Sequence, residues 1–504
     1  MARALSCISD KIVSSNSVEP LSLTAAQLCK CVYSFKYMRL PPPEKYTNPL
    51  GQHVELRKFL STICYIYESA VHSSNNSSND RLSYGELTSS ASVSKEELMY
   101  TTSNIEMRHV TAALWGLRGM STEYPEVRRL MYCLWKLQQT ASNNFLAPSD
   151  FFSSWSDNSK VNRVIETEEL VNSNPAEEIS KILCSLHDKS LSHQVVYEIF
   201  EGVLAGFEKN DINISPRQYR MCLSGLNRMS LNDEAVAVLL EHLNHSLNFS
   251  SHDTDNWGFP ISTVLSGLIN MSNEHAVVRK SIGNIARILE DSMTKHPNSE
   301  THDYMHISSC FYSLRNMSSA YAMDEVEHLI SLLNTLLGNF IKSRGKIHPH
   351  EVGGILHGLQ HIDIDRYRVA QETLALLVDS LRDHTSQSEF KHISHMLLGL
   401  SSSNGNSNTV RVILQEIVHR MGPNNSSDLM GFAVVRMVRG LQTMNTDYGV
   451  VLDAWECLLD AIKRKNVDMS LTEYTDALNS LKSVSYPHSI HQEIRNRLAL
   501  CLKK

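Results

Sequence analysis

Twelve side chains at recurring positions of this 504-residue chain have the chemistry needed to bind a single-stranded nucleic acid. Lysine and arginine can contact phosphates, asparagine and glutamine can hydrogen-bond to base edges, and tyrosine and tryptophan can stack on unpaired bases. These candidate binding residues are Lys36, Arg118, Arg220, Asn227, Arg315, Gln360, Arg439, Gln442, Lys482, Tyr33, Trp115 and Tyr312. They can act together only if the fold brings their positions into one stripe.

The twelve positions are defined by their distance from the leucine of a short recurrent phrase. Residues 225–230, 267–272 and 313–318 read GLNRMS, GLINMS and SLRNMS, and the leucine of each phrase serves as an anchor. The candidate residues lie at offsets −6, −2 and +1 from their anchors. Over ten copies these thirty positions contain six lysines or arginines and no acidic residue, although the formal charge of the chain is −7.

The spacing of the anchors predicts a structural repeat. Weaker copies of the phrase are anchored on Phe35 and Leu117, and from residue 186 onward successive anchors are 40 to 46 residues apart. These later anchors are Leu186, Leu226, Leu268, Leu314, Leu359, Leu400, Leu441 and Leu481. The period is therefore near 41 residues, which is typical of proteins built from stacked helical units.

Each phrase lies at the end of a predicted amphipathic helix. In the copy anchored on Leu117, the apolar residues Val110, Ala113, Leu114 and Met120 share one helix face with the anchor. Offset −1 is Gly or Ser in all ten copies. Because Gly in a helix costs about 1 kcal/mol relative to Ala, we interpret this position as a site of close helix packing.

A second helical pattern follows each phrase after a short turn. It spans residues 126–138 in the Leu117 copy, with Val127, Leu130 and Leu134 on one face. A single helix pair cannot bury its apolar face alone, whereas stacked pairs form a continuous core. The sequence therefore predicts an all-α fold, an α-solenoid of about ten helix-turn-helix repeats.

The solenoid is predicted to cover residues 22–502. Two polar stretches, at about 72–92 and 142–174, are interpreted as insertions because they are rich in Ser and Asn and carry no helical apolar pattern. The first two anchors are 82 residues apart, which leaves open a degenerate repeat near residues 96–103.

Residues 1–21 form an N-terminal extension that is a candidate transit segment. Arg3, Lys11 and several serines fit such a segment, whereas Asp10 and Glu19 count against it. A mitochondrial or chloroplast location and a cytoplasmic location therefore both stay open.

Three stretches carry a resemblance to a known family. AALWGLRGM at 112–120, MCLSGLNRM at 221–229 and GILHGLQHI at 354–362 share an apolar-apolar-x-small-Leu pattern at the end of the first helix. The pattern resembles the octotricopeptide repeats and related organellar helical-repeat proteins. This resemblance implies an α-solenoid that binds single-stranded RNA in mitochondria or plastids, in transcript stability, processing, translation or ribosome assembly, and it brings no catalytic residue.

Composition and motifs narrow the function classes further. A formal charge of −7 excludes a uniformly basic nucleic-acid coat. His357 and His361 are four residues apart, but no cysteine or carboxylate follows at ligand spacing, so no metal site is predicted. No motif of a nucleophilic or metal-dependent hydrolase occurs, so neither an enzyme nor a cofactor is expected. No apolar run reaches the roughly 18 residues of a membrane span, so no membrane insertion is expected.

Two functions fit these observations. The first is a non-catalytic organellar RNA-binding protein that holds a transcript or a ribosomal RNA segment along the cationic stripe. The second is an α-solenoid scaffold that binds another protein in its groove, which the overall acidity favours.

Overall fold

The computed structural model describes most of the predicted repeat region. The described residues are 32–33, 60–61, 63–64, 107–118, 120–141, 175–209, 212–249, 260–295, 306–344, 347–383, 388–465 and 467–502. Lys36, the extension 1–21, both polar insertions and the segment 96–103 lie outside them. The chain divides into two compact units, Met1–Asn256 and Trp257–Lys504, and each is described by itself.

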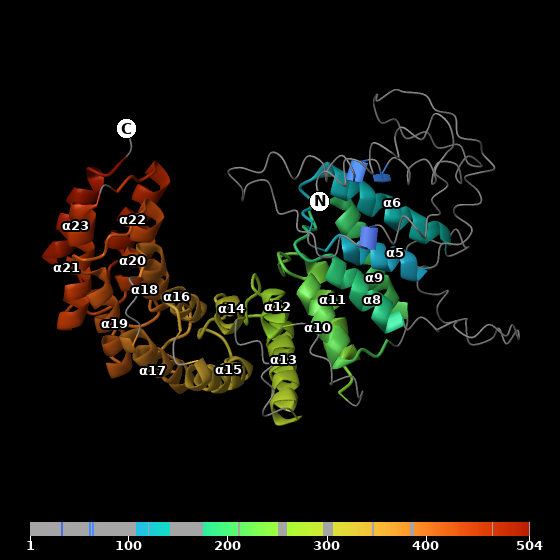
Figure 1. Cartoon of the computed structure of the whole chain (residues 1–504), viewed down its shortest axis with the longest axis horizontal. Helices are drawn as coiled ribbons and strands as arrows, with labels where there is room; N and C mark the ends of the chain where they lie inside the picture. Colours follow the sequence, from blue (N-terminus) through green and yellow to red (C-terminus); the bar gives the residue numbers. More distant parts are fainter. Residues whose placement is uncertain are drawn as a thin grey trace, which may run out of the picture. The chain divides into compact units, whose positions relative to one another are not determined.

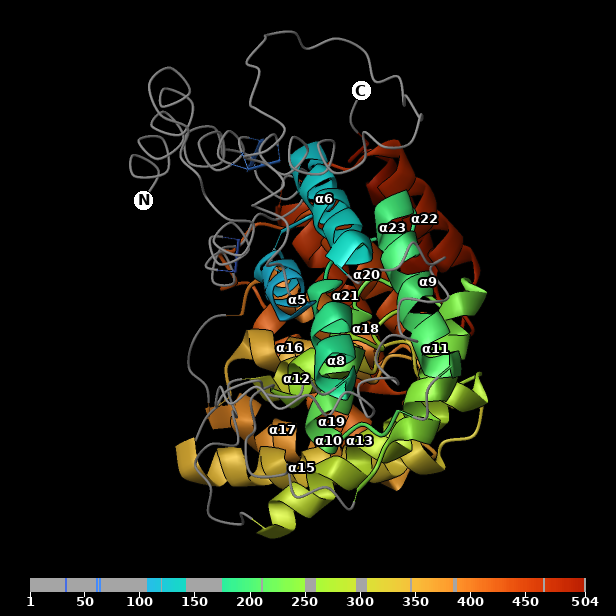
Figure 2. The same ribbon diagram turned by 90° about the vertical axis from the view of Figure 1, so that its right-hand side faces the viewer.

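The first unit contains three described helix pairs. The first helices of these pairs are α5 (Met107–Gly116), α8 (Pro175–Ser185) and α10 (Pro216–Gly225), and the second helices are α6 (Pro125–Ala141), α9 (Gln194–Lys209) and α11 (Glu234–Ser246). Helix α8 packs between α5 and α10, and α9 packs between α6 and α11 (Figures 1 and 2). First helices therefore stack on first helices and second helices on second helices.

The second unit contains six described pairs. Its first helices are α12 (Ile261–Ser266), α14 (Ile307–Ser313), α16 (Pro349–Gly358), α18 (Phe390–Gly399), α20 (Gly431–Leu441) and α22 (Leu471–Lys482). Its second helices are α13 (Ala276–Lys295), α15 (Asp324–Arg344), α17 (Arg368–Asp383), α19 (Asn408–Met421), α21 (Gly449–Arg464) and α23 (Ser489–Ala499). Each helix packs against the next helix of its own layer. In Figure 1 the first helices line the inner side of the curve of this unit.

This arrangement confirms the prediction of an all-α solenoid. The described residues contain no β-strand, and Ile214–Leu247 and Met469–Leu502 are isolated bridges. The nine described pairs correspond to the copies from Leu117 onward, while the copy anchored on Phe35 is described only at Val32 and Tyr33. Within the described helices, none is both long and apolar enough to span a bilayer.

The predicted apolar faces form the core of both units. All nine described anchor leucines are buried. In the first unit Val110, Ala113, Leu114 and Met120 have no exposed surface, as their spacing predicted. Burial of a leucine-sized side chain contributes about 1.5–3 kcal/mol, so each buried anchor leucine stabilises the fold of its unit.

Glycine at offset −1 lets the main chain of one first helix lie directly against the main chain of the preceding first helix. A Cβ atom added to Gly225 would lie 1.9 Å from the main-chain oxygen of Leu183, and one added to Gly358 would lie 2.0 Å from that of Phe311. Equivalent approaches occur at Gly116, Gly399 and Gly440, onto the main chains of Val32, Leu356 and Leu397. The predicted role of the small residue is confirmed at these five positions. In every case the neighbour stands at offset −3 of the preceding copy.

Several first helices begin with capping groups that the sequence encodes locally. Before α10, Ser215 Oγ accepts a hydrogen bond from the Gln218 main-chain N–H, and Gln218 Oε1 accepts one from the Ser215 N–H at 2.9 Å. Ser470 and Glu473 form the same reciprocal pair before α22. These caps satisfy N–H groups that have no partner inside the helix, and so fix where each repeat starts.

Candidate interaction surface on the first-helix layer

Side chains that follow several anchors bind the main-chain carbonyl groups of the preceding repeat. Gln360 Nε2 donates to Arg315 O at 3.1 Å, and Asn316 Nδ2 donates to Ile269 O at 2.7 Å. Thr443 Oγ1 hydrogen-bonds in the same way to Ser401 O at 2.8 Å. The last carbonyls of a helix lack partners within it, so these bonds both satisfy the end of one first helix and set the register of the next.

The three predicted amide side chains take part in this network. Besides Gln360, Asn227 Nδ2 lies 3.4 Å from Asp188 Oδ1, and Gln442 Oε1 accepts from Ser483 Oγ at 3.4 Å. Each bond joins one repeat to its neighbour. Gln360 therefore contacts offset +1 of the preceding copy, whereas Asn227 and Gln442 contact offset +2 of a neighbouring copy.

In the second unit a row of side chains crosses four consecutive first helices. We define the inner row as Tyr312, Arg315, His357, His395 and Arg436, from α14 and its C-terminal turn, α16, α18 and α20. The His357 ring lies 5.1 Å from the Tyr312 ring and 4.9 Å from the His395 ring, edge to face in both pairs. The Arg315 guanidinium lies 4.7 Å from the centre of the Tyr312 ring, within cation–π distance. The row is therefore continuous across four repeats.

Hydrogen bonds fix the protonation of the two histidines. Arg436 Nη1 lies 2.6 Å from His395 Nε2, and the Nδ1 atoms of His395 and His357 are 3.3 Å apart. Because arginine can only donate, His395 Nε2 accepts and its Nδ1–H donates to His357. Burial chiefly lowers the pKa of both His357 and His395 to about 4, and Arg436 lowers both further. Both imidazoles are therefore neutral at pH 7, and the charge of the row belongs to its two arginines.

Neither arginine of the inner row has a carboxylate partner among the described residues. Arg436 is half-buried, contacts His395 and lies 5.0 Å from the Phe432 ring centre, while Arg315 stacks on Tyr312. Burial lowers the pKa of Arg436, and the nearby Tyr312 hydroxyl raises it in part. By contrast, the predicted residue Arg439 forms an exposed ion pair with Asp476 at 3.2 Å. The inner row thus carries an uncompensated double positive charge.

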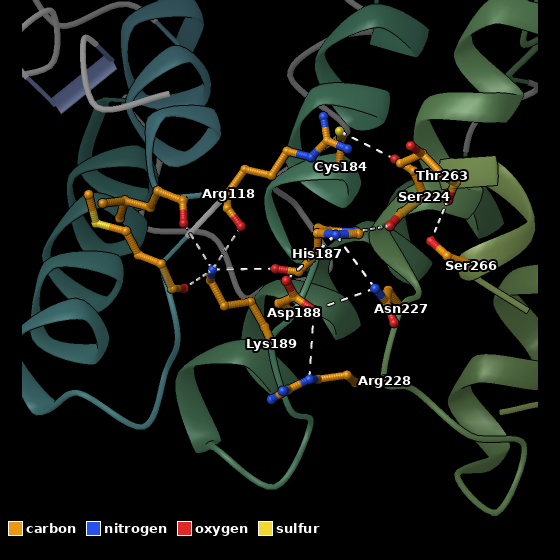
Figure 3. Close-up of polar contacts among 12 residues, drawn as sticks. Arg118, Cys184, His187, Asp188, Lys189, Ser224, Asn227, Arg228, Thr263 and Ser266 are labelled. Atoms are coloured by element: carbon orange, nitrogen blue, oxygen red, sulfur yellow. Dashed lines mark hydrogen bonds and ion pairs between the residues drawn. The ribbon is translucent and has the colours of Figure 1, made fainter. Parts of the chain in front are cut away.

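The first unit places an unpredicted lysine beside the predicted stripe. Lys189 is fully buried, and its Nζ donates to the main-chain oxygens of Leu117 at 2.9 Å, of Arg118 at 3.4 Å and of Met120 (Figure 3). Burial lowers the pKa of Lys189 to about 7, while Asp188 raises it. Lysine here occupies offset +3, where most copies have an apolar residue. This lysine at a normally apolar offset was the one sequence feature that could have predicted its buried position.

An acidic residue lies next to the stripe in the same unit. Asp188 adopts the left-handed conformation with φ of 61° and lies 3.6 Å from both Arg228 Nε and His187 Nε2 (Figure 3). The expectation of an acid-free stripe holds for the three sequence offsets but not for their surroundings. Asp188 at offset +2 and Asp476 at offset −5 both pair with arginines.

The remaining predicted residues differ in exposure. Arg220 is only 3% exposed, and burial lowers its pKa to about 10, so the expectation that it stands on the surface is wrong. The helix turns this residue inward because offset −6 lies near the buried offset −3 of the same helix. Tyr33, Trp115 and Arg118 are half-buried, and Lys482 is exposed.

Sequence reasoning missed His395 and Arg436, which both stand at offset −5. This offset is three residues from offset −2 and so lies on the same helix face. A search that paired −5 with −2 would have found the contact between His395 and His357. The described residues contain no cluster of three or more histidine, cysteine or acidic groups able to hold an ion.

Comparison with known proteins assigns neither a family nor a function to this chain. No protein-family model and no curated protein matches this sequence significantly. The resemblance to octotricopeptide repeats therefore stays a prediction, and any function must be argued from the surface itself.

Proposed function

We propose that this protein is a non-catalytic, organellar RNA-binding protein that holds single-stranded RNA along its first-helix layer. The observation that carries the proposal is the inner row, where two arginines without acidic partners flank three aromatic rings across four repeats. Such a surface offers cations to phosphates and ring edges or faces to unpaired bases.

The inner side of the curved stack suits an extended strand. Successive first helices present equivalent positions at regular intervals, so a flexible single strand can follow them from repeat to repeat. The aromatic groups of the inner row favour unpaired bases, because bases within a duplex are already stacked. The proposed tasks are those of the resembled families: transcript processing or stability, translation, or ribosome assembly in a mitochondrion or chloroplast.

A filter-binding assay with unstructured RNA tests the proposal. We expect salt-sensitive binding by the full chain. Affinity should fall roughly tenfold or more when Arg118, Arg315 and Lys482 are changed to glutamate, because three positive charges on first-helix layers become negative and the net charge falls by six. The control changes Lys280, Lys342 and Arg368, on the second-helix layer, to glutamate. It alters the net charge equally and should leave much more of the affinity intact.

Two results would contradict the proposal. One is the absence of RNA binding at low salt, and the other is an equal loss in both triple variants. Co-purification of a stoichiometric protein partner that survives nuclease treatment, with no RNA affinity, would favour the scaffold function. A fusion of the full chain to a fluorescent protein tests the location, and a purely cytoplasmic signal would contradict the organellar part of the proposal.

A further inference from the structure

We infer that Tyr312 and Arg315 form a platform on which one unpaired base of the RNA stacks. This inference rests on the proposed function and deepens it, because it assigns Arg315 to a base rather than to a phosphate. The observations that carry it are the position of the Arg315 guanidinium over the Tyr312 ring and the contacts that hold this pair in place.

The pair recurs in the sequence at a fixed spacing. Tyr or Trp occupies offset −2 in three copies, and each of these copies has Lys or Arg at offset +1. Residues three apart on a helix lie on the same face, so this spacing favours contact between the ring and the cation. The three pairs are Tyr33 with Lys36, Trp115 with Arg118, and Tyr312 with Arg315.

In the second unit the ring and the cation do meet. The guanidinium carbon of Arg315 lies 4.7 Å from the centre of the Tyr312 ring, and both side chains are half-buried. Arginine planes, like aromatic rings, serve as stacking surfaces for unpaired bases. The guanidinium therefore adds a second flat group to the ring of Tyr312.

Another arginine–tyrosine pair of this unit shows how a structural contact of the same kind differs. On the second-helix layer, Arg411 lies 4.9 Å from the ring centre of Tyr448. Its Nη1 also donates to Gly405 O at 3.1 Å and to Asn406 O at 2.8 Å, so it ties a helix to a loop. No described residue forms a hydrogen bond or an ion pair with the guanidinium of Arg315, which leaves this group available to a ligand.

Contacts from the next repeat hold the platform in place. Gln360 Nε2 donates to Arg315 O at 3.1 Å, and the His357 ring lies edge to face with the Tyr312 ring at 5.1 Å. His357 is fixed in turn by His395, because their Nδ1 atoms are 3.3 Å apart. A surface that is ordered before binding loses less conformational entropy when the ligand arrives, so this support favours stacking.

The variant Arg315→Lys separates a stacking role from a phosphate contact. Lysine keeps the charge but lacks the plane. On an unstructured RNA we expect the affinity to fall roughly fivefold or more, in line with the energy of one stacked base, while the slope of log K against log salt stays unchanged. The matched control is Arg411→Lys, which alters the other arginine–tyrosine pair in the same way and should leave the affinity unchanged.

A second measurement removes the bases instead of the side chain. An oligomer of the same length, built from stable abasic units, keeps every phosphate but has no base to stack. At low salt, where phosphate contacts are strongest, Arg315→Lys and Tyr312→Leu should bind this oligomer as tightly as the wild type does, although both bind RNA less tightly. Equal losses on both oligomers would overturn the platform, because a base would then play no part.

The remaining outcomes separate the platform from the proposed function. If RNA binds and Arg315→Lys keeps the full affinity, the platform is wrong while the proposed function stands. A decrease of about 0.7 in the salt slope of Arg315→Gln would then assign Arg315 to one phosphate contact of a single strand. If the full chain binds no RNA at low salt, the platform and the proposed function are both wrong.

Discussion

At the scale of single residues, two kinds of position in the recurrent phrase have a packing role. Offset −1 must be small because the main chain of the preceding copy occupies the space of a side chain. The other position is offset +3, where Lys189 replaces an apolar residue and binds three carbonyl oxygens of the preceding copy. Each role can be tested by one substitution with a matched control.

Gly440→Ala should destabilise the second unit by more than about 2 kcal/mol. The new Cβ would lie 2.3 Å from the carbonyl group of Leu397, and a main chain cannot yield as a flexible side chain can. The control is Gly449→Ala in the same repeat, where nothing lies within 4 Å and the change should cost no stability. Urea unfolding of both variants measures the difference, and equal stabilities would show that the predicted close approach is wrong.

Lys189→Met should lower the stability of the first unit by about 1–3 kcal/mol. Methionine fills a similar volume, but it leaves buried carbonyl oxygens of the α5 end without their donor. Hydrogen exchange of the amide groups in α5 and α8 measures the loss. Lys280→Met, on the exposed surface of the second unit, is the control. Unchanged protection in the Lys189 variant would mean that the lysine is not a structural clamp.

At the scale of helices, the sequence predicted the elements better than the contacts between them. Apolar spacing was sufficient to place both helices of each pair, because a buried face repeats every three to four residues. The contact of His357 with His395 was not predicted, since it joins offset −2 of one copy to offset −5 of the next. Which offsets meet depends on the crossing angle of neighbouring helices, and a single sequence does not encode that angle in any simple pattern.

The same histidines predict acid sensitivity of the second unit. His357, His395 and His491 all have their pKa lowered to about 4, chiefly by burial, whereas an unfolded chain titrates near 6.5. Between these values the unfolded chain binds more protons, so the free energy of unfolding falls as pH falls. We expect the melting temperature to decrease from pH 6.5 to pH 4.

His395→Gln should weaken this pH dependence, because glutamine keeps hydrogen-bonding capacity but cannot titrate. His419→Gln, at an exposed position of α19, is the control and should leave the pH dependence unchanged. Thermal unfolding followed by circular dichroism at several pH values gives the comparison. A profile of the His395 variant identical to that of the wild type would contradict the burial of a neutral imidazole there.

At the scale of the whole molecule, local charge rather than net charge decides the proposed function. The chain has a formal charge of −7, yet the inner row carries two positive charges with no acid among its described neighbours. In the second unit the sequence stripe contains two members of the inner row, Tyr312 and Arg315, and its binding role stays a prediction. It failed for Arg220, because a column of offsets does not show which side chains neighbouring helices cover.

The most direct test of the account is to map where RNA touches the full chain. Ultraviolet crosslinking to an unstructured RNA, followed by mass spectrometry of the crosslinked peptides, locates the contacts without any substitution. The account predicts crosslinks in the first helices α14, α16, α18 and α20, with Tyr312 and its neighbours prominent. Crosslinks confined to the second helices α15, α17, α19 and α21, or none at all, would contradict it.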